Sequence, residues 1–230
     1  MNKKKIFFLP YAGGSSILYY PMRSLLEKGL NLHLIDYAGH GLRYREPLCK
    51  DFDSMLNDVI NQINQEITVE EEFYIFGHSL GGLLTYECID KLNFTPRQIF
   101  ISAYPAPHYK NDTSLINKSD KELISDLIER GGIDGDDKDS LELIYAFLPA
   151  IRADFEVLIS YPGPKQTKNK IEANILYTSE DQYTDAIREW DKYFDKPCRY
   201  DEFQGDHYFI RREYESIAKL IRSRTSITRR

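Results

Sequence analysis

The chain has 230 residues, of which 42% are hydrophobic and 13% aromatic, which is enough for one buried core and too little for two domains of ordinary size. Thirty lysines and arginines against 36 aspartates and glutamates give a net charge of −6, which argues against general binding to nucleic acid or to anionic membranes. Because no apolar run approaches the roughly 18 residues of a membrane-spanning helix, the sequence predicts a soluble globular protein.

The beginning of the chain and its cysteines indicate the compartment. The basic first residues lead into an apolar stretch that ends at Pro10, short of a signal peptide, so we expect a first strand there. Cys49, Cys88 and Cys198 are odd in number and far apart, and they form neither a disulfide framework nor a metal-ligand spacing. These features favour the reducing cytoplasm.

Short β-branched or aromatic runs alternate with amphipathic stretches along the chain. The runs, each of a length typical of a buried strand, are residues 6–9, 32–35, 73–76, 98–102, 174–178 and 199–203. The stretches with helical periodicity are residues 19–28, 54–66, 80–92, 185–194 and 208–221. This alternation predicts an α/β fold with a mostly parallel central sheet flanked by helices.

One long segment, from about residue 105 to 164, interrupts this alternation. It contains helical patterns around residues 120–130, 140–148 and 151–160 and no convincing strand. We therefore predict one domain over residues 1–230 that carries a helical insertion.

Two charged stretches favour solvated surface over a binding site. Residues 131–137 resemble a calcium loop only superficially, because the sixth position counted from Asp134 is Asp139 and not the glycine of the sharp turn. Residues 211–230 hold seven basic and two acidic side chains, and we expect a solvated helix end there, with a docking patch as the alternative.

Residues 73–82 carry the strongest functional signal. A strand pattern, then Gly-His-Ser-Leu-Gly, then a helical pattern is the context of a nucleophile elbow, where a serine occupies a strained turn. Ser79 is the predicted nucleophile, at a helix N-terminus where free N–H groups stabilise negative charge. Gly77 and Gly81 are expected to be glycine because a Cβ there would collide with the neighbouring strand and helix.

A serine hydroxyl needs a base, and that base must be a histidine oriented by an acid. In the α/β-hydrolase fold the serine, the acid and the histidine follow one another in that order, which leaves His108 and His207 of the five histidines. His108 follows Ser79 by only one βα unit, so there is little room for an acid between them. His207 is therefore the predicted base, and His78 is expected to point away from Ser79.

The strand before His207 ends in two carboxylates, Glu180 and Asp181. The acid of the triad should stand at the end of this strand. The residues alone leave both open, with a solvated pair that has no catalytic role as a third reading. Asp181 becomes the preferred acid through the family pattern given below.

Two backbone N–H groups must stabilise the oxyanion of the tetrahedral intermediate. One is normally the amide that follows the nucleophile, here Leu80. The other should come from the glycine-rich loop at residues 10–15, and Ala12 is the predicted donor. This loop fits neither of the common phosphate-binding glycine motifs, so we expect no phosphate-binding site there. The mechanism as predicted uses no cofactor and no metal.

The pattern as a whole resembles the type II thioesterases of nonribosomal peptide and polyketide synthesis. These stand-alone α/β-hydrolases remove acyl groups from the phosphopantetheine arms of carrier domains. The resemblance spans nearly the whole chain and rests on residues 9–15, 37–47, 77–82, 148–155, Asp181 with Trp190, and 205–209. Two positions depart from the family: Ala38 replaces a usual proline, and no glycine precedes the acid, which keeps Glu180 as an alternative to Asp181.

The resemblance implies a thioester hydrolase that works through an acyl-Ser79 intermediate and acts on acylated carrier proteins. We also expect a monomer. The resemblance also implies a mobile lid formed by the insertion, and Gly131 with Gly132 can serve as its hinge. Arg152 and Asp154 are expected to form a structural pair near the base of this lid.

Two other functions stay open. A triad does not by itself distinguish thioesters from oxygen esters, so a general carboxylesterase or an acyl-coenzyme A thioesterase of the same fold is the first alternative. The second is an α/β-hydrolase that binds a ligand without catalysis, and the complete set of Ser79, Asp181 and His207 argues against it.

Overall fold

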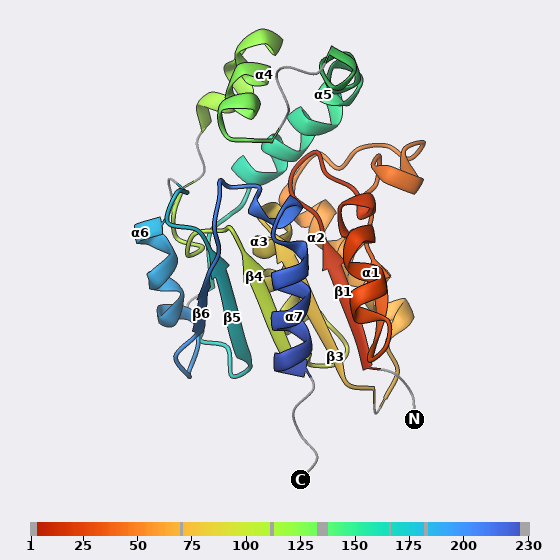
Figure 1. Cartoon of the computed structure of the whole chain (residues 1–230), viewed down its shortest axis with the longest axis vertical. Helices are drawn as coiled ribbons and strands as arrows, with labels where there is room; N and C mark the ends of the chain where they lie inside the picture. The colour runs from red at the N-terminus through yellow and green to blue at the C-terminus, as the bar shows by residue number, and fades with distance from the viewer. Residues whose placement is uncertain are drawn as a thin grey trace.

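A parallel β-sheet forms the centre of the molecule. The computed structural model describes residues 4–69, 71–110, 113–132, 138–165, 167–181 and 184–225. The strands are β1 (Lys4–Leu9), β2 (Leu30–Leu34), β3 (Phe73–His78), β4 (Gln98–Ser102), β5 (Glu172–Tyr177) and β6 (Arg199–Glu202). They form one six-stranded sheet in the order β2-β1-β3-β4-β5-β6 (Figure 1), and every neighbouring pair is parallel. The predicted α/β class is confirmed.

Helices cover both faces of this sheet (Figure 1). The helices are α1 (Tyr20–Leu26) and α7 (Tyr214–Thr225) on one face, and α2 (Phe52–Glu66) and α3 (Leu80–Cys88) on the other. In β1, Ile6 and Phe8 are buried with α1 and α7, whereas Phe7 and Leu9 are buried with α2 and α3. Since successive side chains of a strand point to opposite faces, a continuous apolar run fits a strand that is covered on both sides.

Short polar residues mark the first turns of two helices. The side chain of Asp51 accepts the Ser54 N–H at 2.7 Å before α2 begins. Ser119 and Glu122 form a capping box at the start of α4 (Asp120–Glu129). Both arrangements satisfy backbone N–H groups that have no acceptor within the helix.

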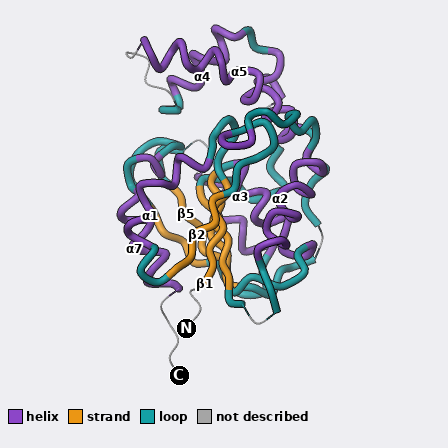
Figure 2. The backbone as a smooth tube through the Cα atoms, turned by 90° about the vertical axis from the view of Figure 1, so that its right-hand side faces the viewer, coloured by secondary structure: helices purple, strands orange, loops and turns teal. Residues whose placement is uncertain are grey.

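The segment between β4 and β5 is helical and consists mainly of α4 and α5 (Lys138–Ile159). Figures 1 and 2 show these two helices together above the edge of the sheet at which the parallel strands end. Leu123 and Leu127 of α4 share an apolar cluster with Leu148 and Ile151 of α5. The insertion thus has a small core of its own, next to the edge where parallel sheets bind ligands.

One continuous helix takes the place of two helices that the sequence predicts in the insertion. Separate helical patterns are expected around residues 140–148 and 151–160, but α5 continues through Pro149. A proline inside a helix removes one backbone hydrogen bond and costs about 3 kcal/mol. Leu148 and Ile151, which are buried on either side of it, offset that cost by packing against α4.

The helix predicted at residues 185–194 is a single turn, α6 (Thr184–Ile187), followed by a 3₁₀ helix over Arg188–Tyr193. Trp190 explains the difference, because its indole is fully buried and donates to the Tyr104 carbonyl at 2.9 Å. This tertiary contact holds the segment against the end of β4, and it outweighs local helix propensity.

Within the described ranges, no helix is both long and apolar enough to cross a membrane, and no group of three His, Cys, Asp or Glu side chains could hold a metal ion. Cys49, Cys88 and Cys198 are free thiols. Most of the acidic stretch at 131–137 falls on residues 133–137, which lie outside the described part of the chain.

Candidate active site

Ser79 occupies the turn between β3 and α3 with a strained backbone. Its φ of 54° and ψ of −118° lie in a region that residues other than glycine rarely adopt. The Ser79 N–H donates to the carbonyl of Ser102 at the end of β4, at 2.7 Å. Ser79 directly precedes α3, so it lies at the N-terminus of that helix, as a nucleophile elbow requires.

Two glycines allow this turn to form. A Cβ on Gly77 would lie 1.9 Å from the Gly81 carbonyl oxygen, and a Cβ on Gly81 would lie 2.2 Å from the Leu9 carbonyl oxygen. Backbone atoms cannot move aside as a flexible side chain can. Helix α3 can therefore approach β3 and β1 this closely only with glycine at both positions.

The structure brings Ser79, His207 and Asp181 together in a hydrogen-bonded row. His207 Nε2 lies 3.0 Å from Ser79 Oγ, and His207 Nδ1 lies 2.6 Å from Asp181 Oδ2. Asp181 follows β5 and is 7% exposed, and His207 follows β6. Because Nδ1 donates to the carboxylate, Nε2 is free to accept the serine proton.

The rival residues lie elsewhere. Glu180 is exposed, whereas Asp181 is buried against His207. His108 Nε2 lies 2.6 Å from a carboxylate oxygen of Glu189, away from the serine. The geometry therefore favours Asp181 as the acid and His207 as the base.

His78 points away from Ser79 and packs behind His207. Its Nδ1 lies 2.9 Å from Ser102 Oγ, and its Nε2 lies 3.0 Å from the His207 carbonyl oxygen. Burial, together with the neighbouring His207, lowers the pKa of His78 well below its usual value, so the ring is neutral. The tautomer that satisfies both contacts donates from Nε2 to the His207 carbonyl and accepts a hydrogen bond from the Ser102 hydroxyl at Nδ1. No sequence signal points to this contact, which joins residues 129 positions apart.

A buried carboxylate from α5 holds the loop that contains Ala12. The Gly13 N–H donates to Asp154 Oδ2 at 2.6 Å, and a Cβ on Gly13 would lie 2.4 Å from the Ile151 side chain. Ala12 lines the cavity that is described below. Leu80, the other predicted oxyanion donor, is the first residue of α3, where a backbone N–H has no acceptor within the helix.

Asp154 pairs with His40 and not with Arg152, which corrects the expected pair at the base of the insertion. Asp154 Oδ2 lies 3.1 Å from His40 Nε2, with both side chains almost completely buried, whereas Arg152 lies 2.6 Å from Asp120. His40 Nδ1 faces the Ala38 carbonyl at 3.1 Å. Burial alone would lower the pKa of His40, but hydrogen bonding to Asp154 and the charge of Asp154 outweigh it and raise that pKa. A positive charge on the ring is favoured by the neighbouring carboxylate, which is the physical cause of this rise.

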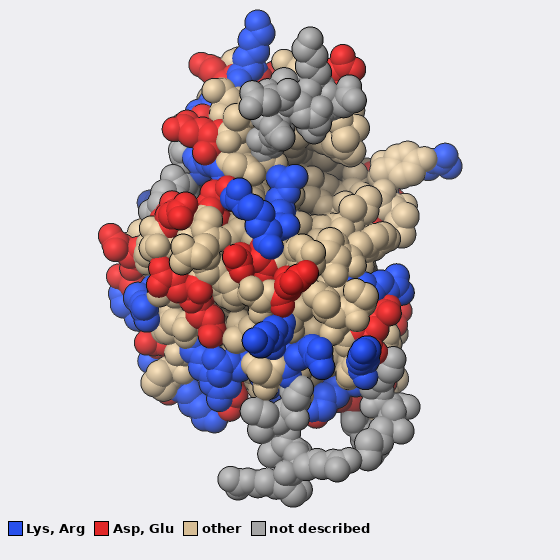
Figure 3. Space-filling model, viewed as in Figure 1, with Lys and Arg blue, Asp and Glu red and all other residues tan. Residues whose placement is uncertain are grey.

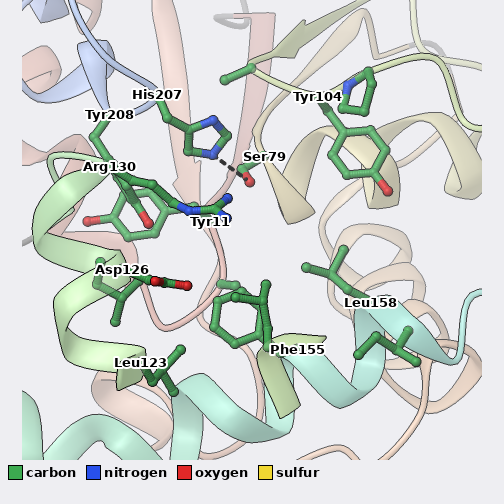
Figure 4. A pocket seen from close by; sticks show the side chains of 16 residues that line it. Tyr11, Ser79, Tyr104, Leu123, Asp126, Arg130, Phe155, Leu158, His207 and Tyr208 are labelled. Carbon is green, nitrogen blue, oxygen red and sulfur yellow. Dashed lines mark hydrogen bonds between the residues drawn. The ribbon is translucent and has the colours of Figure 1, made fainter. Parts of the chain in front are cut away.

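A cavity of about 770 Å³, its open mouth included, lies between the serine and the insertion. Its lining includes Ser79, His207 and apolar side chains such as Leu123, Leu127 and Phe155. Figure 4 shows the His207 ring beside the Ser79 hydroxyl, with the α4 and α5 side chains on the opposite side of the cavity. An apolar cavity that ends at a nucleophile suits an acyl chain.

The surface charge is mixed. Figure 3 shows basic and acidic side chains interspersed over the face that carries α1 and α7. Near the C-terminus, Arg212 contacts Asp206, and Arg224 lies 3.3 Å from Asp201. These local partners favour a solvated helix end over a docking patch, and residues 226–230 lie outside the described chain.

Residues 4–225 match the family model described as the thioesterase domain. The chain belongs to the thioesterase family. Thioester hydrolysis is accordingly the class of reaction that it performs.

Similar proteins are named for the biosynthesis of particular compounds. AngT of Vibrio anguillarum, described as a probable anguibactin biosynthesis thioesterase, is 29% identical over 231 residues, covering 95% of this chain and 90% of AngT. GrsT of Aneurinibacillus migulanus, a gramicidin S biosynthesis protein, is 27% identical over 231 residues, covering 95% of this chain and 86% of GrsT.

Solved structures agree with this assignment. ClbQ from the colibactin NRPS/PKS pathway has a TM-score of 0.84 at 25% identity, over 96% of both chains. BorB, a type II thioesterase from the borrelidin biosynthetic cluster, has a TM-score of 0.86 at 24% identity, over 96% of this chain and 92% of BorB. The predicted α/β-hydrolase fold and the resemblance to type II thioesterases are confirmed.

We expect Asp181→Asn to lower kcat by about 10³- to 10⁴-fold, because an amide no longer holds the His207 tautomer that accepts the serine proton. Glu180→Gln, the matched change at the exposed neighbour, should leave kcat within about threefold. Steady-state kinetics of both variants on one acyl thioester make the comparison. A larger loss for Glu180→Gln would show that the acid is Glu180.

We expect Asp154→Asn to lower kcat by about 10- to 100-fold with little change in KM, because a displaced oxyanion donor weakens binding of the transition state more than that of the substrate. Glu156→Gln, an exposed position on the same helix, is the control and should match wild type. If Asp154→Asn lowers only Tm and leaves kcat within about twofold of wild type, Asp154 has no part in positioning the loop.

Proposed function

We propose that this protein hydrolyses acyl thioesters on the phosphopantetheine arm of carrier proteins, through an acyl-Ser79 intermediate. The observation that carries the proposal is the row Ser79, His207 and Asp181 at the cavity of a chain in the thioesterase family. AngT is named for anguibactin biosynthesis, and ClbQ is described as part of the colibactin NRPS/PKS pathway. Removal of wrong or stalled acyl groups from the carriers of such a synthetase or synthase is the role we assign to this chain.

The acylation half of the reaction uses all three side chains. His207 Nε2 takes the Ser79 proton as Oγ attacks the thioester carbonyl carbon. Asp181 accepts the hydrogen bond from Nδ1–H and stabilises the imidazolium. The carbon–sulfur bond then breaks, and the imidazolium returns its proton to the departing sulfur, which leaves as the phosphopantetheine thiol.

The deacylation half repeats these steps with water. His207 removes a proton from a water molecule, whose oxygen attacks the acyl carbon of the ester on Ser79. The ester bond breaks, the proton passes to Ser79 Oγ, and the carboxylic acid leaves. In both halves the amides of Ala12 and Leu80 are the proposed donors to the oxyanion, and Asp154 holds the loop that contains the first of them.

The insertion at about 105–164 is the proposed lid of this site. Helices α4 and α5 supply apolar lining to the cavity, so an acyl chain would lie beneath them. The proposal takes the protein to act as a monomer in the cytoplasm, where thiols such as Cys88 and Cys198 stay reduced.

We expect kcat/KM to be higher for an acyl group on a carrier protein than for the same acyl group on coenzyme A. Contacts with the carrier surface lie far from the thioester, and their binding energy can position the thioester against Ser79. The measurement is steady-state kinetics with acetyl groups presented in both forms. Equal or higher kcat/KM for acetyl-coenzyme A would favour a general acyl-coenzyme A thioesterase.

A matched oxygen ester and the Ser79→Ala variant complete this experiment. The account predicts faster cleavage of the thioester than of the oxygen ester, and a loss of several powers of ten in kcat for Ser79→Ala. Preference for the oxygen ester would assign the protein as a carboxylesterase.

A further inference from the structure

Two charged side chains, one from α4 and one from the residue that caps its C-terminus, enter a cavity that is otherwise mostly apolar. Asp126 and Arg130 are four residues apart, on one face of the helix, and both line the cavity with Ser79 and His207. Figure 4 shows both side chains reaching inward from α4, with the Arg130 guanidinium on the side of Tyr11 and Tyr208. Neither charge has a part in the proposed transfer of the acyl group.

The charge of Asp126 already has a partner, whereas that of Arg130 does not. The Lys118 ammonium contacts Asp126 Oδ2, so these two charges cancel. Arg152, a basic residue of the neighbouring helix, lies 2.6 Å from Asp120. Among the described residues, the Arg130 guanidinium has no hydrogen bond or ion pair. It therefore leaves the wall of the cavity with an uncompensated positive charge.

The position of Arg130 is fixed relative to the loop that carries His207. A Cβ on Gly131 would lie 2.3 Å from Asp206 Oδ2, so the end of α4 packs directly against this loop. The guanidinium of Arg211 donates to the Gly132 carbonyl at 2.8 Å. Gly131 and Gly132, which the sequence predicts as a hinge, are therefore closely packed against the loop that carries His207. This packing fixes the position of the adjacent Arg130 relative to the triad.

The charge of Arg130 acts inside the cavity. Burial raises the pKa of the Tyr208 hydroxyl, and the positive charge of Arg130 opposes that rise. A partly buried guanidinium that faces a cavity without a counter-charge is suited to an oxyanion ligand, because its planar N–H groups match a carboxylate or a phosphate with two parallel hydrogen bonds.

We propose that Arg130 is an anion-recognition residue of this cavity, and that the protein favours thioesters that carry an anionic oxygen group. The inference rests on the proposed function, since it concerns the substrate of the same serine. Two parts of a carrier-bound substrate have this chemistry: a carboxylate on the acyl chain and the phosphate of the phosphopantetheine arm. Arg130 and Ser79 line the same cavity, so an anion on the acyl chain that is bound at Ser79 is the favoured ligand of Arg130.

The test compares malonyl and propionyl thioesters of N-acetylcysteamine, which differ by a carboxylate in place of a methyl group and contain no phosphate. We expect Arg130→Gln to lower the ratio of kcat/KM for malonyl over propionyl by about 10- to 100-fold, the effect of losing a charged hydrogen bond. Arg130→Lys should keep part of the preference. Arg152→Gln, on the neighbouring helix and outside the cavity, should leave the ratio as in wild type.

A second pair of substrates, acetyl-pantetheine and acetyl-phosphopantetheine, tests the other source of the anion. If Arg130→Gln reduces only the preference for the phosphorylated arm, the recognised anion is the phosphate. If Arg130→Gln leaves both ratios at their wild-type values, Arg130 recognises no anion and the proposal is overturned.

A binding measurement separates this inference from the proposed function. In a Ser79→Ala background, calorimetry with the malonyl thioester gives Kd without any turnover, and addition of Arg130→Gln should raise Kd about 10-fold or more. This shift would support anion recognition even if wild type hydrolyses none of the four thioesters. An unchanged Kd for both the malonyl and the phosphopantetheine ligands would overturn it.

Discussion

The close contact of helix α3 with the ends of β1 and β3 is the constraint on which the candidate site depends. No Cβ fits at Gly77 or Gly81, and the turn between them holds Ser79 at a positive φ. Such a backbone costs about 1–3 kcal/mol. The cost is offset by burial, because every residue of α3 is buried. The position of the serine is therefore set by the core of the protein.

Each other part of the site is bonded to a different element of the fold. The backbone of His207 is held by His78 of β3, and the loop that contains Gly13 is held by Asp154 of α5. The end of α4 packs against the residue that precedes His207. The insertion thus contacts both the oxyanion loop and the histidine loop, so displacement of α4 and α5 would alter two parts of the reaction centre together.

Sequence pattern was sufficient to predict the sheet and to select Ser79 and His207, whereas the preference for Asp181 over Glu180 rested on the family resemblance. All six strands coincide with short runs within a repeating alternation, although β6, with the sequence Arg-Tyr-Asp-Glu, is largely polar. Ser79 lies in a motif whose flanking strand and helix are both evident within residues 73–82. The order of serine, acid and histidine along the chain then selected His207, which the structure places beside Ser79.

What the sequence could not predict depends on contacts between distant segments. Two contacts join positions more than a hundred residues apart: the pair of His40 with Asp154, and the hydrogen bond from His78 to the His207 carbonyl. In neither contact does a sequence motif around one residue indicate its partner. Separate helical patterns were expected around residues 140–148 and 151–160, but α5 runs continuously through Pro149, where its packing against α4 overrides the local rule. The same limit applies to Gly131, whose role in close packing depends on Asp206.

Labelling with a fluorophosphonate, followed by peptide mapping, tests the central claim most directly. A fluorophosphonate reacts with a serine that a neighbouring base has activated. The account predicts one phosphonyl group per chain, located on Ser79, with slow labelling in His207→Ala and none in Ser79→Ala. Thioester turnover that continues in a protein whose Ser79 takes no label, or a label on another residue, would contradict the account.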